Sequence, residues 1–323
     1  MNKSFLSEND LCPLCASSQR RPAFVGTDLL HGLPGRYEYV ECRICGLIYQ
    51  MPLPSPEKIA SFYPEQYDPY RPTSLKNKNR FEKAVLRDKY GYRHLDSSVP
   101  GWLSWCLAPL VLRDAVHFLG NHRLLDVGCG SGRYLQSMRN LGWEVDGVEF
   151  NDGAAQTCRQ AGLRVFAGEL AQAGFADETF AVVTARHVLE HIAEPKAFVA
   201  EIFRILQPGG WLVLKTPNSR ALARNWFGPK WYPNDAPRHL MLYSPANLRR
   251  LAQEQGFIPK RWFTESSPKA ILNSWDYVSG NRGKPSRKRR LRRLLARVYV
   301  VAAGLDSGRG DEINIIFVKP EKQ

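Results

Sequence analysis

The most constraining feature of this chain is a regular alternation of short apolar runs with segments of helical period, which begins at Arg123. Buried strands that alternate with amphipathic helices form a parallel sheet with helices on both faces. The pattern therefore predicts the α/β class. The expected strands are RLLDVG, WEVDGVEF, LRVFAG, AVVTA and WLVLKTP, and the expected helices are RYLQSMRNLG, DGAAQTCRQAG and PKAFVAEIFRIL.

The turn after the first expected strand, DVGCGSG, is rich in glycine. An acid and three glycines stand at every second position of this turn: Asp126, Gly128, Gly130 and Gly132. Glycines let the backbone approach a ligand closely, and Glu149, at the end of the next strand, stands where an acid in such folds binds two ribose hydroxyls. A nicotinamide dinucleotide and S-adenosylmethionine both fit this geometry. Because Asp126 would repel a pyrophosphate and attract a sulfonium and an ammonium, the sequence favours S-adenosylmethionine.

Four of the seven cysteines form two C-x-x-C units, Cys12 with Cys15 and Cys42 with Cys45. Each tight turn brings two thiolates to one ion, and two turns complete a closed tetrahedral shell, which predicts a structural Zn²⁺. The stretch YEYVECRICGLIY predicts two short strands around the second unit, as in a zinc ribbon. The alternative is four reduced cysteines without a metal.

The sequence also resembles a known family. LDVGCGSG, GVEF, HVLEHI, LQPGGWLVLKTPN and DEINIIFVKP together resemble the class I S-adenosylmethionine-dependent methyltransferases, near the ubiquinone-biosynthesis O-methyltransferase branch. With the four cysteines and PRHLMLYSPANLRRLAQEQGF, the chain is similar to the zinc-containing methyltransferases of bacterial surface-glycan clusters. The resemblance covers most of 123–265 and 311–319.

This resemblance implies a Rossmann-like sheet of seven strands, the last of which, 311–319, is antiparallel. It implies that Glu149 binds the ribose and that Glu169 lies near the adenine. The methionine part would be held by Asp126, Gly128, Gly130 and Gly132. The family usually has Asp where this chain has Ala181.

The segment HVLEH has the spacing of an inverted zinc-protease motif. A protease would need this motif inside a helix, whereas here His187 stands where the fourth strand is expected to end. Ubiquinone-type relatives hold a divalent metal at the corresponding positions, with an acid in place of His187. The alternative is that His187, Glu190 and His191 hydrogen-bond the loop and shape the pocket. A second metal at these three residues stays open.

The segment TPNSRALARNWFGPKWYPNDAPRHLMLYSP is expected to lie over the C-terminal edge of the sheet, where ligands bind in this architecture. Its mixture of aromatic and polar residues suits a sugar or another hydroxylated ring: Trp226, Phe227, Trp231, Tyr232, Asp235, Arg238 and His239. We expect His239 to be the catalytic base and Asp235 to orient it. The alternative is that Arg238 and His239 only hold the loop in place.

Basic residues concentrate in one segment. The formal net charge is +14, and nine basic residues without an intervening acid lie within 282–297. Drawn as a helix, this region places an apolar stripe opposite several arginines. The stripe is Leu291, Leu294, Leu295, Val298, Ala302 and Leu305, and the arginines are Arg289, Arg292, Arg293 and Arg297. Such a helix suits an anionic membrane surface, so we expect a peripheral contact through 287–305. The alternatives are packing of the stripe on the protein's own core and RNA binding.

We expect three segments along the chain. Residues 1–70 form a zinc-ribbon-like module and a largely extended connector, 71–122 a helical linker, and 123–323 the methyltransferase domain with a basic helical insertion at about 266–308. No apolar run reaches the ~18 residues that span a bilayer, and the N-terminus lacks the apolar part of a signal peptide. We therefore expect a cytoplasmic protein, peripheral at the inner membrane face.

The sequence predicts an S-adenosylmethionine-dependent methyltransferase that acts on a glycan, glycolipid or nucleotide-sugar intermediate. The acceptor would be a hydroxylated small molecule or a lipid-linked sugar. One alternative is an RNA methyltransferase, because a zinc module and a basic helix suit RNA. However, ARHVLEH lacks the polar-Pro-Pro-aromatic motif usual in RNA methylases of the amino type, so nucleic acid is the less favoured partner. The other alternative is a catalytically silent scaffold that binds S-adenosylmethionine.

Overall fold

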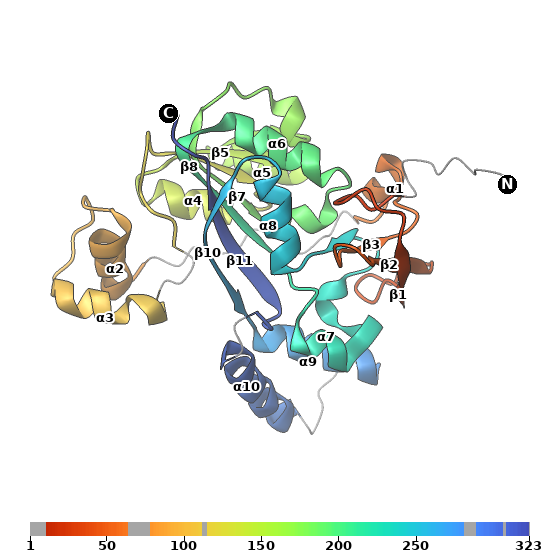
Figure 1. The fold of residues 1–323 in the computed structure, drawn as a ribbon. Coiled ribbons are helices and arrows are strands. Elements are labelled where there is room, and N and C mark those ends of the chain that lie inside the picture. The colour runs from red at the N-terminus through yellow and green to blue at the C-terminus, as the bar shows by residue number, and fades with distance from the viewer. Residues whose placement is uncertain (1–10, 64–77, 112–114, 281–288, 306–307, 323) are drawn as a thin grey trace. The chain divides into compact units, whose positions relative to one another are not determined.

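The computed structural model describes residues 11–63, 78–111, 115–280, 289–305 and 308–322. Figure 1 shows the ribbon of the chain coloured by residue number. The chain divides into two compact units, each built from segments that are separate in the sequence. Unit 1 comprises Met1–Glu65, Arg186–Ala200 and Leu214–Phe317, and unit 2 comprises Gln66–Ala185, Glu201–Val213 and Val318–Gln323. The sequence-based division into three consecutive segments stays a prediction about domain boundaries.

Unit 1 contains a four-stranded sheet in the order β1-β2-β3-β9. Its strands are β1 (Arg20–Gly26), β2 (Tyr37–Cys42), β3 (Ile48–Gln50) and β9 (Met241–Leu242). Strands β2 and β3 run antiparallel on either side of the second cysteine unit, as the zinc-ribbon prediction requires. The sequence did not predict β9, which pairs antiparallel with β3 through Ile48 with Leu242 and Tyr49 with Met241. A strand from the predicted acceptor loop therefore completes the N-terminal module.

The predicted connector is not extended throughout. Helix α1 (Pro56–Ala60) begins after Ser55, whose side chain accepts a hydrogen bond from the amide of Lys58. Proline at the first helical position has the backbone angle that a helix needs and lacks an N–H that would be unpaired there. The rest of the connector, 64–77, lies outside the described residues.

In unit 2, helices and strands alternate as predicted. Helices α2 (Arg80–Tyr90) and α3 (Gly101–Val111) lie in the predicted helical linker. The elements that follow are β4 (Arg123–Val127), α4 (Arg133–Arg139), β5 (Glu144–Glu149), α5 (Asp152–Gln160), β6 (Arg164–Ala167), the 3₁₀ helix η3 (Leu170–Ala173) and β7 (Phe180–Arg186). The fourth predicted strand forms although the chain has Ala181 where the family usually has Asp. Ala181 is buried within β7.

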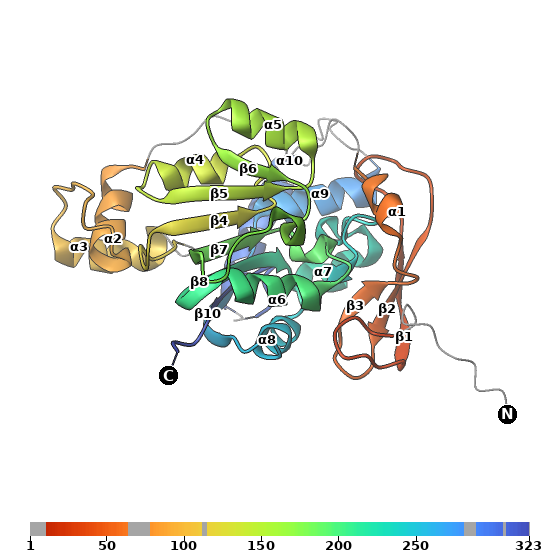
Figure 2. The ribbon, with the colours of Figure 1, turned by 90° about the horizontal axis from the view of Figure 1, so that it is seen from above.

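The main sheet has seven strands in the order β10-β11-β8-β7-β4-β5-β6. Strand β4 is parallel to β5 and β7, and β5 is parallel to β6, so the loops that follow these strands leave the same edge of the sheet (Figure 2). Strand β11 is antiparallel to β8, because Gly209 bonds Lys319 near one end while Asn218 bonds Asp311 near the other. The Rossmann-like seven-stranded fold with an antiparallel last strand is therefore confirmed.

The remaining elements are α6 (Pro195–Ile205), β8 (Leu206–Pro217), η4 (Leu189–His191), α7 (Leu222–Phe227), η5 (Gly228–Lys230), η6 (Tyr232–Asn234), α8 (Pro245–Gln253), β10 (Ile258–Glu265), α9 (Pro268–Ser279), α10 (Arg289–Leu305) and β11 (Glu312–Val318). Helices α9 and α10 occupy the predicted insertion. Within the described ranges, no helix is both long enough and apolar enough to cross a bilayer.

A buried ion pair joins the N-terminal module to the rest of unit 1. The guanidinium of Arg238 is fully buried and donates to both carboxylate oxygens of Asp28, at 2.8 and 3.0 Å. It also donates to both oxygens of Asp235, at 2.7 and 3.0 Å. Burial alone would raise the pKa of Asp28, but the hydrogen bonds from Arg238 lower it to about 2.

We predict that Asp28→Asn lowers the free energy of unfolding by about 3–5 kcal/mol, because the variant leaves part of a buried charge unpaired. The folded-state pKa of Asp28 lies below its ordinary value, so this contribution is complete above about pH 4 and is lost as the pH falls toward 2. Urea unfolding of the variant should therefore depend less on pH in that range than unfolding of the wild type.

The matched control is Glu41→Gln, which breaks the exposed bidentate pair with Arg21 in the same module. We expect this change to cost less than about 1 kcal/mol, because exposed ion pairs contribute little. Equal losses for the two variants would contradict a stabilising role for the buried pair.

Candidate active site

The glycine loop in unit 2 connects β4 to α4 in a backbone conformation that favours glycine. Gly128, Gly130 and Gly132 have φ angles of 69°, 52° and 70°. A Cβ on Gly132 would also lie 2.7 Å from a methyl of Leu163 and 2.8 Å from the sulfur of Cys158, which is closer than side chains tolerate. The loop therefore needs glycine for both its angles and its packing.

Two buried carboxylates flank this loop. Asp126 accepts a hydrogen bond from the hydroxyl of Thr184 on β7. Glu149 accepts from the amide of Gly130 at 2.7 Å and from the amide of Asn151 at 2.9 Å, one on each oxygen. Burial raises the pKa of Glu149, and these amides oppose the shift.

The arrangement fits an adenosine ribose. Each carboxylate oxygen of Glu149 accepts one amide and keeps a second lone pair for a hydroxyl. Glu169 is exposed and follows β6, two residues beyond Ala167, the register partner of Glu149. The two acids thus follow neighbouring parallel strands at one edge of the sheet, where the resemblance implied ribose and adenine contacts.

The four cysteines of unit 1 cluster as predicted. The sulfurs of Cys12 and Cys45 are 3.6 Å apart, those of Cys15 and Cys42 are 3.5 Å apart, and all four lie within 4.8 Å of one another. These distances exclude a disulfide and match the edge of about 3.8 Å that a tetrahedron with ~2.3 Å metal–sulfur bonds requires. Burial raises the pKa of Cys15, and a bound cation would favour its thiolate.

A second cluster lies in unit 1, where η4 meets the segment before β9. His187 follows β7, as predicted, with a φ of 55°, and η4 then carries Glu190 and His191. The amide of Leu240 donates to the carbonyl of Glu190 at 2.7 Å and thereby holds His239 beside η4. Potential ligand atoms of Glu190, His191 and His239 lie within 4.8 Å of one another, and the rings of His191 and His239 meet edge to face.

The tautomer of His239 follows from its neighbour. Its Nδ1 lies 2.8 Å from the carbonyl oxygen of Pro233, which can only accept a hydrogen bond, so Nδ1 carries the proton. The lone pair of the neutral ring is therefore on Nε2. That atom lies 3.9 Å from a carboxylate oxygen of Glu190 and 4.0 Å from one of Asp235.

Glu190 is a buried carboxyl group with few direct partners. Its side chain is fully buried, and within the described ranges neither oxygen has a hydrogen-bond partner. Nδ1 of His187 lies 3.4 Å from one oxygen. Burial alone would raise the pKa of Glu190, but the neighbouring histidines lower it to about 2, while burial lowers the pKa of His191 to about 4.

Asp235 bonds Arg238 through both oxygens, and one of them lies 4.0 Å from Nε2 of His239. Its orienting role stays a prediction, while the carbonyl of Pro233 contacts Nδ1 of the same ring. Trp231 was expected to offer an aromatic face, but it is 1% exposed and packs in a core with Ile271. Trp226 is the exposed aromatic residue of that predicted set, at 66%.

The N-terminal module surrounds the segment that carries His239. The hydroxyl of Tyr39 donates to the carbonyl of His239 at 2.8 Å, and the amide of Gln50 donates to the carbonyl of Leu240 at 2.8 Å. The side chain of Asn247 donates to the carbonyl of Cys45 at 2.7 Å. No sequence pattern indicated these contacts, because each joins residues far apart in the chain.

Two comparisons with known proteins identify the family. The family model described as a methyltransferase domain matches residues 105–258. Ubiquinone biosynthesis O-methyltransferase from Thiobacillus denitrificans is 30% identical over 163 residues, which cover 46% of this chain and 70% of that protein. The chain belongs to the class I S-adenosylmethionine-dependent methyltransferases.

Further similar proteins share part of their length with this methyltransferase. Ubiquinone biosynthesis O-methyltransferase from Maricaulis maris is 32% identical, and the alignment covers 42% of this chain and 58% of that protein, less than two thirds of its length. A solved S-adenosylmethionine-dependent methyltransferase from Archaeoglobus fulgidus is 18% identical with a TM-score of 0.45, and the match covers 73% of this chain and 98% of that one.

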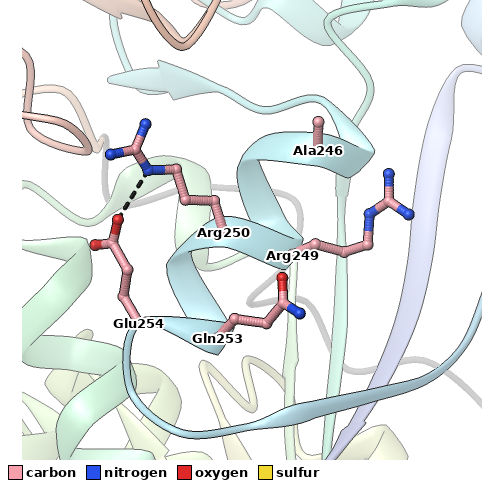
Figure 3. A pocket seen from close by; sticks show the side chains of 5 residues that line it. All are labelled: Ala246, Arg249, Arg250, Gln253 and Glu254. Atoms are coloured by element: carbon pink, nitrogen blue, oxygen red, sulfur yellow. Dashed lines mark hydrogen bonds and ion pairs between the residues drawn. The ribbon is translucent and has the colours of Figure 1, made fainter.

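The methyltransferase also has a hollow on the surface of α8 (Figure 3). It is lined by Ala246, Arg249, Arg250, Gln253 and Glu254, and Arg250 pairs with Glu254 at 2.8 Å. These residues belong to successive turns of one helix, and all five lie outside the cluster around His239. We do not assign the hollow to the active site.

Proposed function

We propose that this methyltransferase transfers a methyl group to a hydroxyl of a glycan, glycolipid or nucleotide-sugar intermediate. The observation that carries the proposal is the Nε2 atom of His239, which holds a lone pair beside two carboxylates. Its relatives named as O-methyltransferases support an oxygen nucleophile. Lipid-linked sugars belong to the same acceptor class, and peripheral membrane contact through 287–305, at the cytoplasmic face, is part of the proposal.

The donor site of this proposal is the glycine loop with its two acids. S-adenosylmethionine, when bound, supplies a methyl group on a cationic sulfur and leaves as S-adenosylhomocysteine. Asp126 and the loop glycines would hold its methionine part, Glu149 its ribose hydroxyls, and Glu169 would lie near its adenine. The φ angles of the loop and the free lone pairs of Glu149 support these roles.

We predict that Glu149→Gln weakens S-adenosylmethionine binding by about 1–3 kcal/mol, because the ribose loses a charged hydrogen-bond acceptor. Isothermal titration calorimetry measures the loss. The control is Glu144→Gln, at the opposite end of the same strand and paired with Arg164. Equal affinity in wild type and Glu149→Gln would contradict the assigned role of Glu149.

His239 is the proposed general base. A bound donor would supply the methyl group to the acceptor oxygen and keep the electron pair of the broken carbon–sulfur bond on its sulfur, and Nε2 of His239 would take the hydroxyl proton. The carbonyl of Pro233 holds the ring in the tautomer that can take this proton. Glu190 and Asp235 lie close enough to interact with the resulting charge without first bonding Nε2.

We predict that labelled methyl groups pass to lipid-linked glycan or nucleotide-sugar fractions and not to RNA. The assay incubates wild-type protein and labelled donor with each fraction separately. His239→Ala should lower turnover about 10²-fold while donor affinity is retained, and His31→Ala, which changes an exposed histidine of unit 1, should keep full turnover.

The outcomes of this assay separate the alternatives. Label in RNA alone would replace the sugar acceptor with RNA. Donor binding without transfer to any fraction would favour the silent scaffold. Full turnover in His239→Ala would leave His239 with a structural role only.

We further propose that Cys12, Cys15, Cys42 and Cys45 hold a structural Zn²⁺. Their spacing supports a closed four-sulfur shell. Such a shell offers no open position for a reacting molecule, so the ion would act on catalysis only through the fold. The bond from Asn247 to the carbonyl of Cys45, together with the β3–β9 pairing, supports such an indirect route to His239.

We predict one tightly bound zinc per chain by elemental analysis, and its loss in Cys42→Ser. Turnover should fall with the metal, while donor affinity should persist because the donor residues belong to unit 2. Cys106→Ser, which changes an exposed cysteine, is the control. Full zinc content in the quadruple serine variant of the four cysteines would contradict the assignment and direct attention to Glu190, His191 and His239.

A further inference from the structure

Helix α10 packs on unit 1 through a narrow face of mostly small residues. Ala296, Tyr299 and Ala303 are buried in a core formed with α7 and α9. The hydroxyl of Tyr299 donates to the carboxylate of Asp311 and accepts from the amide of Ala223. Figure 1 shows α9 and α10 side by side. The helix is therefore held firmly while most of its surface is left uncovered.

Large apolar side chains of α10 lie outside this core. They recur at helical spacing along one stripe and are between 45% and 66% exposed: Leu291, Leu294, Leu295, Val298 and Val301. The alternative that the predicted stripe packs on the protein's own core is therefore wrong for Leu291, Leu294, Leu295 and Val298, and Val301 extends the exposed stripe. A stripe of this kind, extending over much of a helix of about 25 Å, is rarely left open to water in a soluble protein.

Positive charge borders the stripe. Arg290, Arg293 and Arg297 are exposed, and with 100° between successive residues all three fall along one side of the stripe. Arg292 lies on the packed side, where it pairs with Asp276 at 3.5 Å. The side chains of Arg289 and Leu305 lie outside the described set. No acidic residue occurs in the sequence between Asp276 and Asp306.

We propose that the exposed face of α10 docks on an anionic lipid surface, with the apolar stripe inserted at the interface and Arg290, Arg293 and Arg297 at the headgroups. The combination favours lipid over other partners. RNA would use the arginines but leave five large apolar side chains in water. A second copy of the stripe would bring like-charged arginines together. A lipid surface satisfies both features at once.

This inference rests on the proposed function only for its purpose, which is to bring the enzyme to a lipid-linked acceptor. Vesicle binding is measured without donor or acceptor, so its failure would leave the proposed methyl transfer intact. Equally, a failure to methylate any sugar would not contradict the proposal that α10 docks on lipid.

The experiment is co-sedimentation of the full chain with vesicles. One set contains equal parts phosphatidylglycerol and phosphatidylcholine, and the other contains phosphatidylcholine alone. We expect binding to the first set only, with weakening by salt. Leu294→Ser with Val298→Ser, and separately Arg290→Glu with Arg293→Glu and Arg297→Glu, should each lower the partition coefficient by on the order of ten-fold.

The control reverses three arginines elsewhere in unit 1: Arg249→Glu, Arg250→Glu and Arg261→Glu. It matches the charge change of the α10 triple variant and should keep vesicle binding. Unchanged donor affinity and helical content verify that each variant is folded.

Three results would overturn the proposal. Equal loss in the control would mean that bulk charge alone drives binding. Wild-type binding by the double serine variant would mean that the stripe is not inserted. Absence of binding to either vesicle at low salt would exclude a lipid surface, and RNA retention or a stripe-dependent dimer in the same samples would then identify the true partner.

Discussion

The buried guanidinium of Arg238 forms the ion pairs on which the attachment of the N-terminal module to the segment before β9 depends. It lies between Asp28 of the N-terminal module and Asp235 of the loop, and each carboxylate accepts two of its hydrogen bonds. Burial of a charge costs desolvation free energy and is tolerated only when opposite charges and hydrogen bonds compensate for it. Sequence reasoning treated holding the loop and catalysis as alternatives for this segment. The contacts show that Arg238 holds the loop in place. His239 keeps a lone pair on Nε2, which is available for the catalytic role that we propose.

Compensation of buried polar groups by their neighbours also accounts for the cluster of ionisable groups around His239. The surrounding histidines lower the pKa of Glu190 against the effect of its burial, and the pKa of His191 falls because that ring is buried beside another imidazole. The carbonyl of Pro233 then selects one tautomer of His239. Backbone carbonyls and the ion pair thus control ring orientation, while the carboxylates near Nε2 stay unbonded to it.

Sequence reasoning succeeded where structure is local. The positions of Asp126, Glu149 and His187 near the ends of their strands could be predicted, because the apolar period and the glycine positions specify each βα turn within a few residues. The contact of Glu190 with His239, the Arg238–Asp28 pair and the β3–β9 pairing could not, because each joins distant segments without a periodic signal. Trp231 shows a further limit of prediction from sequence. The sequence around an aromatic residue in a polar loop does not distinguish a side chain that faces a ligand from one that packs in a core.

Strand β9 has a consequence for how this enzyme can be divided. It contributes only Met241 and Leu242, both buried, and its described pairing partner is β3 of the N-terminal module. A shortened protein without the module would carry a bare strand edge with two water-exposed apolar residues, the kind of edge that recruits other chains into aggregates. The cysteine-rich module is therefore an integral part of unit 1 and not a detachable appendage, because its removal would leave β9 without the pairing that the structure describes.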